Sequence, residues 1–290
     1  MAKNYDSIII GTGQAGPSLA ERLSQTGRNI AVIERNLFGG TCVNTGCIPT
    51  KTLVASAKVA NMVSRAAEYG VNINGDINID MKRVKARKDE VSGASNKGVE
   101  GWLKNMKNVD IYEGHGRFVD NYTVQVNDEI LEADNIFINV GGRANVPPIE
   151  GLNEVKFFTN SDMMQVDFLP EHLIIIGGSY IGLEFAQMYR RFGSEVTVVE
   201  MSDRLISRED EEISENIKEI LENEGINFRL SAECITAGKN GKDIQVGVDC
   251  NKGDKEISGS HLLVATGRLP NTHDLGIENT DIKLDKRGYI

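Results

Sequence analysis

The sequence predicts an α/β protein of two three-layer ββα domains, with the second domain inserted into the first. The main observation is an internal repeat, because an apolar strand, a glycine-rich turn, a helix and a second apolar strand follow one another twice along the chain. Each copy is followed by alternating apolar and polar residues, typical of antiparallel strands, and then by an apolar run that ends in glycine. Strands that alternate with helices indicate parallel sheets.

The first copy of the repeat starts near the N-terminus. The apolar run Ser7–Ile10 leads into a turn over Gly11–Gly16, and after a helical stretch the run Ile30–Ile33 ends at Glu34. This order predicts a parallel strand pair joined by a helix.

The second copy has the same order and the same spacing. The run Leu173–Ile176 leads into a turn over Gly177–Gly182, and Val196–Val199 ends at Glu200. Glu34 follows the first glycine of its turn by 23 residues (34 minus 11), and Glu200 follows Gly177 by 23 residues (200 minus 177).

This context is typical of dinucleotide binding. Glycines let the backbone approach a pyrophosphate, the helix N-terminus attracts that anion, and the acidic residue accepts hydrogen bonds from ribose hydroxyls. A single copy is equally well explained as a tight turn without a ligand. Two copies with matching spacing favour two Rossmann-like nucleotide-binding domains.

Further strands close each repeat. The runs Ile136–Gly142 and Leu262–Arg268 are expected to be apolar strands that end in glycine, at Gly141-Gly142 and at Gly267. Small antiparallel meanders are expected before them, around residues 119–131 and 244–257. Residues 52–106 are helical in character.

Prolines mark the expected linkers, at Pro147-Pro148 and at Pro270-Asn271. The predicted domains are therefore residues 1–148, residues 149–269, and a segment 270–290 that returns toward the first domain. Within the helical stretch, the basic run Lys82–Lys88 is predicted to be a solvated helix face rather than a partner site.

Charge and hydropathy exclude several classes of function. The net charge of −10 and the pI near 5.1 disfavour nucleic acid as a partner. No apolar run reaches the roughly 18 residues of a membrane helix, and the first residues do not form a signal peptide, so we expect no membrane partner and a cytoplasmic location.

Two of the four cysteines, Cys42 and Cys47, stand close together. Five residues of regular helix advance about 7.5 Å and turn the side chains apart, so a disulfide requires a distorted segment, which Gly46 and Pro49 would permit. The alternatives are two buried thiols or half of a zinc site, which would need two more ligands. Cys234 and Cys250 are expected to be ordinary small hydrophobic residues, and no metal site is expected.

The segment Gly39–Lys51, Gly-Gly-Thr-Cys-Val-Asn-Thr-Gly-Cys-Ile-Pro-Thr-Lys, resembles the active-site signature of the flavin-dependent pyridine nucleotide-disulfide oxidoreductases, such as lipoamide dehydrogenase, glutathione reductase and mercuric reductase. The second glycine turn, Ala265–Arg268 and Pro270-Asn271 also match this family, so the resemblance covers the whole chain. It implies an enzyme with FAD and NAD as cofactors and a redox-active disulfide.

The resemblance also implies roles for individual residues. The thiol of Cys42 would exchange with substrate, and Cys47 would face the flavin as a thiolate. Lys51 would lie near the flavin and pair with Glu184, and Tyr180 would gate the nicotinamide pocket. The implied FAD-binding residues are Gly11, Gly13, Gly16, Glu34, Gly40, Thr41, Cys42, Lys51, His115, Gly116, Gly142 and Arg268. The implied NAD-binding residues are Gly177, Gly178, Tyr180, Ile181, Gly182, Glu200 and Gly267.

NADH should be preferred over NADPH because of Glu200. A 2′-phosphate about 4 Å from this carboxylate would cost about 4 kcal/mol per charge pair at an effective dielectric constant of about 20. Arg204 and Arg208 follow and could soften the repulsion.

Members of the family continue with a Gly-Asp pair after a strand and with an interface domain that supplies His and Glu to the partner subunit. The pairs Gly75-Asp76 and Gly253-Asp254 stand in polar stretches, and the chain stops at Ile290. We therefore expect an N-terminal portion without the interface domain, with weak FAD binding and incomplete turnover, whose full-length protein is a homodimer.

The electron acceptor is predicted only as a class. Thr50 stands where glutathione reductases typically carry lysine, so the pattern favours the lipoamide dehydrogenase and mercuric reductase side and a small-molecule disulfide or metal-ion substrate. The alternative is an inactive fragment or a nucleotide-binding redox sensor without turnover.

Overall fold

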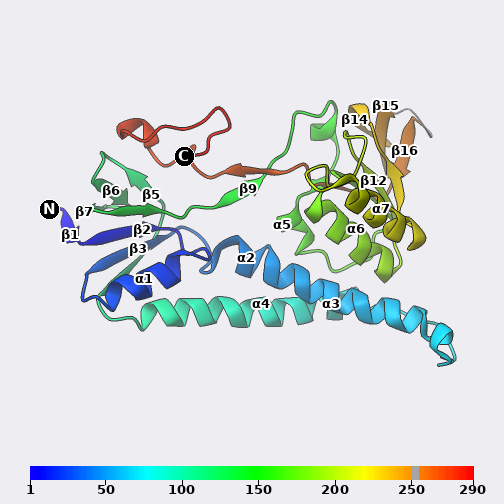
Figure 1. Ribbon diagram of the computed structural model, residues 1–290, viewed down its shortest axis with the longest axis horizontal. Helices are drawn as coiled ribbons and strands as arrows, with labels where there is room; N and C mark the ends of the chain where they lie inside the picture. Colours follow the sequence, from blue (N-terminus) through cyan, green and yellow to red (C-terminus); the bar gives the residue numbers. More distant parts are fainter. Residues whose placement is uncertain (250–254) are drawn as a thin grey trace. The chain divides into compact units, whose positions relative to one another are not determined.

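The computed structural model describes residues 1–249 and 255–290, and Figure 1 shows its helices and strands. The chain forms two compact units. Unit 1 consists of residues 1–49, 89–143 and 268–290, and unit 2 consists of residues 50–88 and 144–267. Residues 144–267 of unit 2 interrupt unit 1 in the sequence, which confirms the expected insertion. The domain limits predicted at residues 148 and 269 stay predictions.

Unit 1 is built on a parallel sheet with the strand order β4-β3-β2-β8. Its strands are β2 (Ser7–Ile10), β3 (Ile30–Glu34), β4 (Val109–Glu113) and β8 (Ile136–Ile138). The helix α1 (Gly16–Ser24) and the part of α4 (Met81–Lys104) that belongs to unit 1 cover one face (Figure 1). Ile9 and Val32 of the sheet pack there against Ala20 and Leu103.

A small second sheet covers the other face of the parallel sheet of unit 1. Its order is β1-β7-β6-β5, from β1 (Lys3–Tyr5), β5 (Gly116–Phe118), β6 (Thr123–Val126) and β7 (Glu129–Ala133). Ile8 and Ile10 pack against Val124 and Leu131 of this sheet. Successive isoleucines of β2 thus point to opposite faces, as the period of two in a strand requires.

Unit 2 repeats this architecture. Its parallel sheet has the order β10-β17-β11-β12-β13. The strands are β10 (Phe157–Phe158), β11 (His172–Ile176), β12 (Glu195–Val199), β13 (Asn227–Arg229) and β17 (His261–Val264). Leu173 and Ile175 pack in a core with helical residues, including Leu53 and Phe185. The helices are α3 (Cys47–Ser64, of which residues 50–64 belong to unit 2), α5 (Asn160–Met163), α6 (Tyr180–Phe192) and α7 (Glu211–Asn223).

The opposite face of this sheet packs against an antiparallel meander, where Ile174 and Ile176 contact a core that includes Val246 and Ile257. The meander consists of β14 (Glu233–Asn240), β15 (Asp243–Asp249) and β16 (Glu256–Gly259). Both units are therefore three-layer ββα domains, which confirms the predicted fold class.

The remaining elements are short. They are α2 (Gly40–Asn44), β9 (Gly142–Ala144), β18 (Arg268–Pro270) and the 3-10 helices η1 (Ala66–Tyr69), η2 (Leu152–Glu154) and η3 (Ile277–Asn279). β9 and β18 pair with each other. Across the described residues 1–249 and 255–290, no helix is both long and apolar enough to span a bilayer.

Two local expectations hold only in part. Cys234, expected to be an ordinary small hydrophobic residue, is exposed where the register of β14 shifts between Glu233 and Thr236, with a φ of +49°. The basic run is exposed at Lys82, Arg83 and Arg87, as expected of a solvated face, but Lys88 is only 3% exposed, because it shares a face of α4 with the core residues Met81 and Val84. Cys250 and Gly253-Asp254 lie outside the described residues.

Candidate functional site

The first glycine turn of unit 1 has the shape that a pyrophosphate requires. Gly11 has a φ of +102°, and a Cβ at this position would lie 2.4 Å from the carbonyl oxygen of Asn139. A Cβ at Gly16 would lie 2.3 Å from the carbonyl oxygen of Gly11. Only glycine fits these two positions, so α1 can begin close to the strand end with its N-terminus at the carboxyl edge of the sheet.

The turn of unit 2 follows the same plan. Gly177 has a φ of +117° with its missing Cβ 2.5 Å from the carbonyl oxygen of Ala265, and the missing Cβ of Gly182 would lie 2.0 Å from the carbonyl oxygen of Gly177. Ser179 is the N-cap of α6. Both turns therefore leave a helix N-terminus free for an anion, which fits the phosphates of FAD and NAD.

The acidic residue at the end of each second strand binds its own glycine turn. In unit 1, Glu34 accepts hydrogen bonds from the backbone N–H of Thr12 (2.9 Å) and of Asn36 (2.9 Å), and also from the Thr12 hydroxyl. In unit 2, Glu200 accepts them from the backbone N–H of Gly178 (2.6 Å) and of Ser202 (2.8 Å). Each carboxylate is thus held in place beside the glycines.

The segment with the two cysteines is not a continuous helix. Cys42 lies in α2, which ends at Asn44, and Cys47 is the first residue of α3. Gly46 lies in the break, where a Cβ would be only 2.9 Å from the carbonyl oxygen of Thr41. This is the distortion that the spacing of the cysteines requires, and Gly46 permits it.

Both cysteines are free thiols that contact each other. Cys42 is half-buried and Cys47 is exposed. Burial raises the pKa of the Cys42 thiol, and its hydrogen bond with Cys47 raises that pKa further. The two sulfur atoms are therefore placed as a dithiol that two-electron oxidation could join.

Several other residues with an expected FAD role lie around the glycine turn of unit 1. Gly40 has a φ of +59°, and its missing Cβ would be 2.9 Å from the Cα of Gly13. Arg268 donates hydrogen bonds to the Thr41 hydroxyl (3.4 Å) and to the carbonyl oxygen of Gly142. The two strands β9 and β18 thus connect to the segment that precedes Cys42.

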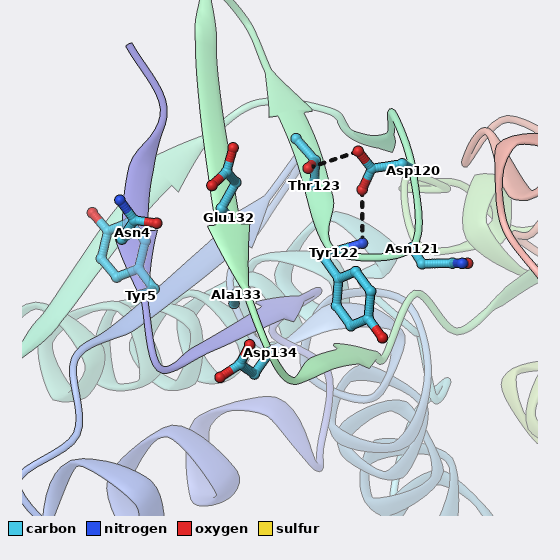
Figure 2. Close-up of a pocket in the computed structure, with 9 residues that line it drawn as sticks. All are labelled: Asn4, Tyr5, Asp120, Asn121, Tyr122, Thr123, Glu132, Ala133 and Asp134. Carbon is cyan, nitrogen blue, oxygen red and sulfur yellow. Dashed lines mark hydrogen bonds between the residues drawn. The ribbon is translucent and has the colours of Figure 1, made fainter.

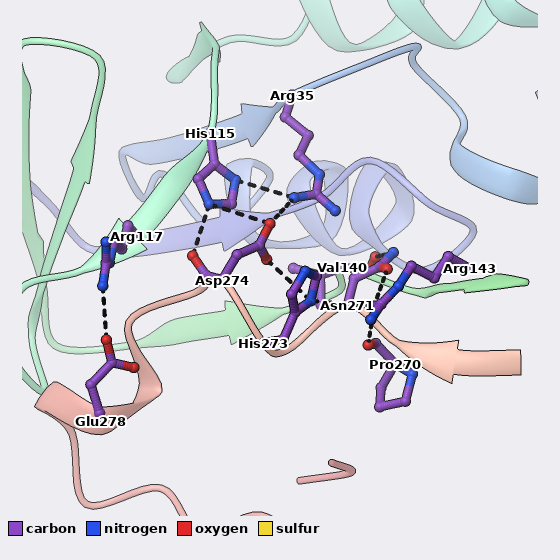
Figure 3. A network of polar contacts seen from close by, with 10 residues as sticks. All are labelled: Arg35, His115, Arg117, Val140, Arg143, Pro270, Asn271, His273, Asp274 and Glu278. Atoms are coloured by element: carbon purple, nitrogen blue, oxygen red, sulfur yellow. Dashed lines mark hydrogen bonds and ion pairs between the residues drawn. The ribbon is translucent and has the colours of Figure 1, made fainter. Parts of the chain in front are cut away.

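His115 and Gly116 lie at the carboxyl end of β4 and the start of β5. A Cβ at Gly116 would contact Ile33 at 3.2 Å. Figure 3 shows His115 in a polar network with Arg35 and Asp274. Arg35 donates to the Asp274 carboxylate (2.7 Å) and to His115 Nδ1 (3.4 Å). Since a guanidinium only donates, Nδ1 accepts, and Nε2 donates to the carbonyl oxygen of Asp274 (2.9 Å).

Sequence reasoning missed Arg35 and Asp274. Burial would raise the pKa of the Asp274 carboxyl, but the hydrogen bond and the charge of Arg35 hold it below the ordinary value. Arg143 donates to His273 Nδ1 (3.2 Å) and to the carbonyl oxygen of Pro270 (2.8 Å) (Figure 3). These contacts tie the segment after β18 to β9 within unit 1. Arg35 directly follows Glu34, whereas nothing in the sequence pattern marks Asp274.

Unit 2 contains the other expected catalytic residues. Lys51 of α3 donates a hydrogen bond to Glu184 of α6, with side chains that are 66% and 34% exposed. Tyr180 is the first residue of α6 and donates its hydroxyl to Glu209, which sequence reasoning also missed. Ile181 follows Tyr180 in α6. Gly267 has a φ of +119° and no atom within 4 Å of its missing Cβ.

A surface cavity of about 500 Å³ also lies in unit 1, and Figure 2 shows its lining. Asp120 accepts hydrogen bonds there from the backbone N–H of Tyr122 (2.8 Å) and from the Thr123 hydroxyl (3.0 Å). Tyr5 and Glu132 line it as well. None of the expected site residues lines this cavity.

Comparisons with known proteins agree on one family. The family described as pyridine nucleotide-disulphide oxidoreductase matches residues 5–290. Mercuric reductase of Staphylococcus aureus is 32% identical over 99% of this chain and 52% of its own length, and dihydrolipoyl dehydrogenase of Acholeplasma laidlawii is 34% identical over 99% and 84%. The probable pyridine nucleotide-disulfide oxidoreductase RclA of Escherichia coli is 36% identical over 99% and 62%.

A solved structure supports the same assignment. The Cu(II) complex of the HOCl-induced flavoprotein disulfide reductase RclA from Escherichia coli superimposes with a TM-score of 0.86 at 34% identity, over 99% of this chain and 62% of that chain. The present chain thus spans between about half and five-sixths of the length of these relatives.

Proposed function

This chain belongs to the pyridine nucleotide-disulphide oxidoreductase family, and we propose that its protein is an FAD-dependent enzyme that passes electrons from NADH to a Cys42/Cys47 disulfide and on to a small-molecule disulfide or an oxidised metal ion. FAD, if held at Gly11, Gly13 and Gly16, would supply the two-electron transfer between NADH and the disulfide. The disulfide takes up these two electrons and two protons and opens to two thiols, which the acceptor then reoxidises.

The observation that carries the proposal is the contact between the thiols of Cys42 and Cys47 across the break between α2 and α3. The glycine turns support it, since Gly11, Gly16, Gly177 and Gly182 allow each helix to begin close to its strand end, as the helix N-terminus of a dinucleotide site does. We assign Gly11, Gly13 and Gly16 to the FAD pyrophosphate. Glu34 holds the turn through the Thr12 N–H and is proposed to accept a hydrogen bond from the ribose.

Lys51 is proposed to place a positive charge beside the flavin, where it would stabilise negative charge that develops on reduction. Its ammonium group donates a hydrogen bond to Glu184, which orients the Lys51 side chain. Glu184 therefore serves as a positioning residue. Cys42, which is half-buried, is proposed to exchange with the acceptor, and Cys47 to react with the flavin.

NADH is proposed as the electron donor in preference to NADPH. Both oxygens of Glu200 bind backbone N–H groups, so the carboxylate stays in place at the end of β12. A 2′-phosphate would meet this fixed negative charge. Arg204 donates to the carbonyl oxygen of Ser207 (3.1 Å) and is thus engaged within its own loop. Specificity constants that favour NADPH would contradict this assignment.

The proposed acceptor class is supported by the relatives, whose names include mercuric reductase and dihydrolipoyl dehydrogenase, and by the Cu(II) complex of RclA among the solved structures. The test measures NADH oxidation with FAD present and with oxidised lipoamide, a glutathione-type disulfide, Hg(II) or Cu(II) as acceptor. We expect at least one acceptor to support turnover, and Cys42→Ser to abolish it while Cys234→Ser does not. Turnover that survives Cys42→Ser would refute the disulfide path.

The whole protein is proposed to act as a homodimer, as the family resemblance implies. Sedimentation of the whole protein and of the 290-residue chain would measure this directly. A whole protein that is monomeric at full activity would contradict the assignment.

A further inference from the structure

We propose that Glu209 is a positioning residue that latches the Tyr180 side chain across the carboxyl edge of the parallel sheet of unit 2, where a nicotinamide dinucleotide would lie, so that the dinucleotide must release this latch in order to bind. Tyr180 is 53% exposed and would be free to rotate, yet its hydroxyl donates a hydrogen bond to the Glu209 carboxylate. The inference rests on the proposed nicotinamide role of unit 2.

The loop that carries Glu209 is fixed against the glycine turn. The backbone N–H of Ile206 donates to the carbonyl oxygen of Gly178 (3.0 Å), and the N–H of Glu209 donates to the carbonyl oxygen of Ile206 (2.8 Å). A Cβ at Gly178 would lie 2.7 Å from the Leu205 side chain. Leu205 is itself 1% exposed, so it anchors the loop in the core.

Ile206 has an unusual backbone for a β-branched residue. Its φ is +40°, in the left-handed region that such residues rarely adopt, and it is 5% exposed. Strain of this kind persists where the surrounding structure enforces it, and it is frequent at ligand-binding sites. The four residues that follow Ile206, Ser207 to Asp210, are exposed.

The order of the strands in the sheet of unit 2 indicates where the Tyr180–Glu209 bond lies relative to a bound dinucleotide. Ligands of open parallel sheets bind outside the carboxyl ends of the strands, next to the helix N-termini. Tyr180 begins the helix after β11, whereas Glu209 lies on the loop after β12. β11 and β12 are neighbours in the sheet. A side-chain bridge between these two segments therefore crosses the edge where a dinucleotide would lie.

Glu209 also affects the phenol directly. Its hydrogen bond raises the pKa of the Tyr180 hydroxyl above the ordinary value, although the nearby Arg208 opposes the shift. This offers a signature of the latch that requires neither FAD nor turnover.

The test uses the 290-residue chain without added FAD, so that NADH binds without being oxidised. Calorimetry gives the dissociation constant of NADH for the wild type, Glu209→Ala, Tyr180→Phe and the double variant. Breaking a hydrogen bond to a charged group at an exposed position should change the dissociation constant of NADH by about 2-fold to 10-fold. We expect each single variant to bind NADH tighter by such a factor, and the double variant to bind no tighter than either.

A matched control is Glu215→Ala, an exposed carboxylate on α7. It should leave the dissociation constant unchanged. In parallel, NMR of tyrosine Cζ, assigned with Tyr180→Phe, should show the pKa of Tyr180 falling in Glu209→Gln and not in Glu215→Ala. A merely structural role of Glu209 would not move this pKa.

The outcomes separate the latch from the proposed function. Glu209→Ala that binds NADH as the wild type does, or more weakly, overturns the latch and leaves the proposed function standing. Additive effects of the two single variants also overturn the latch. No NADH binding by any variant, with the chain folded, overturns the nicotinamide role of unit 2 and the inference with it.

Discussion

Glu34 and Glu200 bind their own glycine turns through the same pair of backbone hydrogen bonds, one in each unit. Each carboxylate accepts one bond from the backbone N–H of the residue after the first glycine, which is Thr12 or Gly178. It accepts a second bond from the backbone N–H of the residue two positions after the glutamate, which is Asn36 or Ser202. The two residues also stand at the same offset, since 200 minus 34 and 177 minus 11 are both 166. Each turn is therefore held in shape by hydrogen bonds to its own carboxylate.

The first prediction concerns the buried carboxylate of Glu34, which is 8% exposed. Glu34→Ala leaves the N–H groups of Thr12 and Asn36 without their acceptor and should lower the free energy of unfolding by about 1–3 kcal/mol. Chemical denaturation measures this, with Glu132→Ala at an exposed position of β7 as the control. Equal stability of Glu34→Ala and the control would show that the carboxylate does not hold the turn.

The second prediction concerns Gly11. Gly11→Ala forces a Cβ toward the carbonyl oxygen of Asn139 at a φ of +102° and should destabilise unit 1 by more than about 1 kcal/mol. Gly98→Ala is the matched control, because this helical glycine has no atom within 4 Å of its missing Cβ. Alanine there should stabilise the chain by about 0.5–1 kcal/mol. Opposite signs in thermal unfolding are expected, and loss of stability in both variants would contradict the argument.

The third prediction concerns the thiol of Cys42. Burial and then Cys47 raise the pKa of this thiol above its ordinary value of 9.0. Alkylation of reduced Cys42, followed by mass spectrometry of the peptide, should therefore be slow at neutral pH, and the midpoint of its rise with pH should lie above the ordinary value, since the thiolate is the reactive form. In Cys47→Ser the midpoint should fall. A midpoint that is the same in both proteins would show that the thiols do not interact.

The fourth prediction concerns Asp274, whose carboxyl pKa lies below its ordinary value of 3.8. A lowered pKa in the folded state adds stability that is present above the unfolded value and is lost as the pH falls through the folded value. Hydrogen exchange in residues 271–280 should thus accelerate below about pH 4 in the wild type. In Asp274→Asn it should be fast already at neutral pH.

Asp281→Asn is the control for this experiment. Asp281 lies in the same segment but accepts its hydrogen bond from the neutral amide of Asn121 (2.7 Å). The Asp281→Asn variant should show the same acceleration of hydrogen exchange at low pH as the wild type. If Asp281→Asn loses this acceleration, or if Asp274→Asn keeps it, the Arg35–Asp274 pair is not its cause.

The repeated architecture could be predicted from the sequence because its signals are local. The apolar runs of β2 and β11 are buried on both faces and therefore read as continuous, and the glycines are required by close approaches a few residues away. The interrupted helix between Cys42 and Cys47 followed from the geometry of a helical turn.

Contacts between distant polar side chains could not be predicted. Arg35 and Asp274 are 239 residues apart, and no periodicity links them. The bond between Tyr180 and Glu209 joins residues 29 positions apart, and the left-handed backbone of Ile206, which lies between them in the sequence, is not predicted by its residue type. Cys234 is exposed at the point where the register of β14 shifts. Such a shift changes the face of the sheet to which a side chain points without changing the apolar pattern of the neighbouring residues.

The central claim is that electrons pass from NADH through FAD to the Cys42/Cys47 pair. An anaerobic absorbance titration tests it most directly, with FAD added to the chain first and NADH second, on the wild type, Cys47→Ser and the control Cys234→Ser. We predict that NADH bleaches the flavin and that a long-wavelength band between thiolate and flavin grows in the wild type and in Cys234→Ser but not in Cys47→Ser. A flavin that NADH bleaches with the same spectrum in all three proteins would contradict the claim.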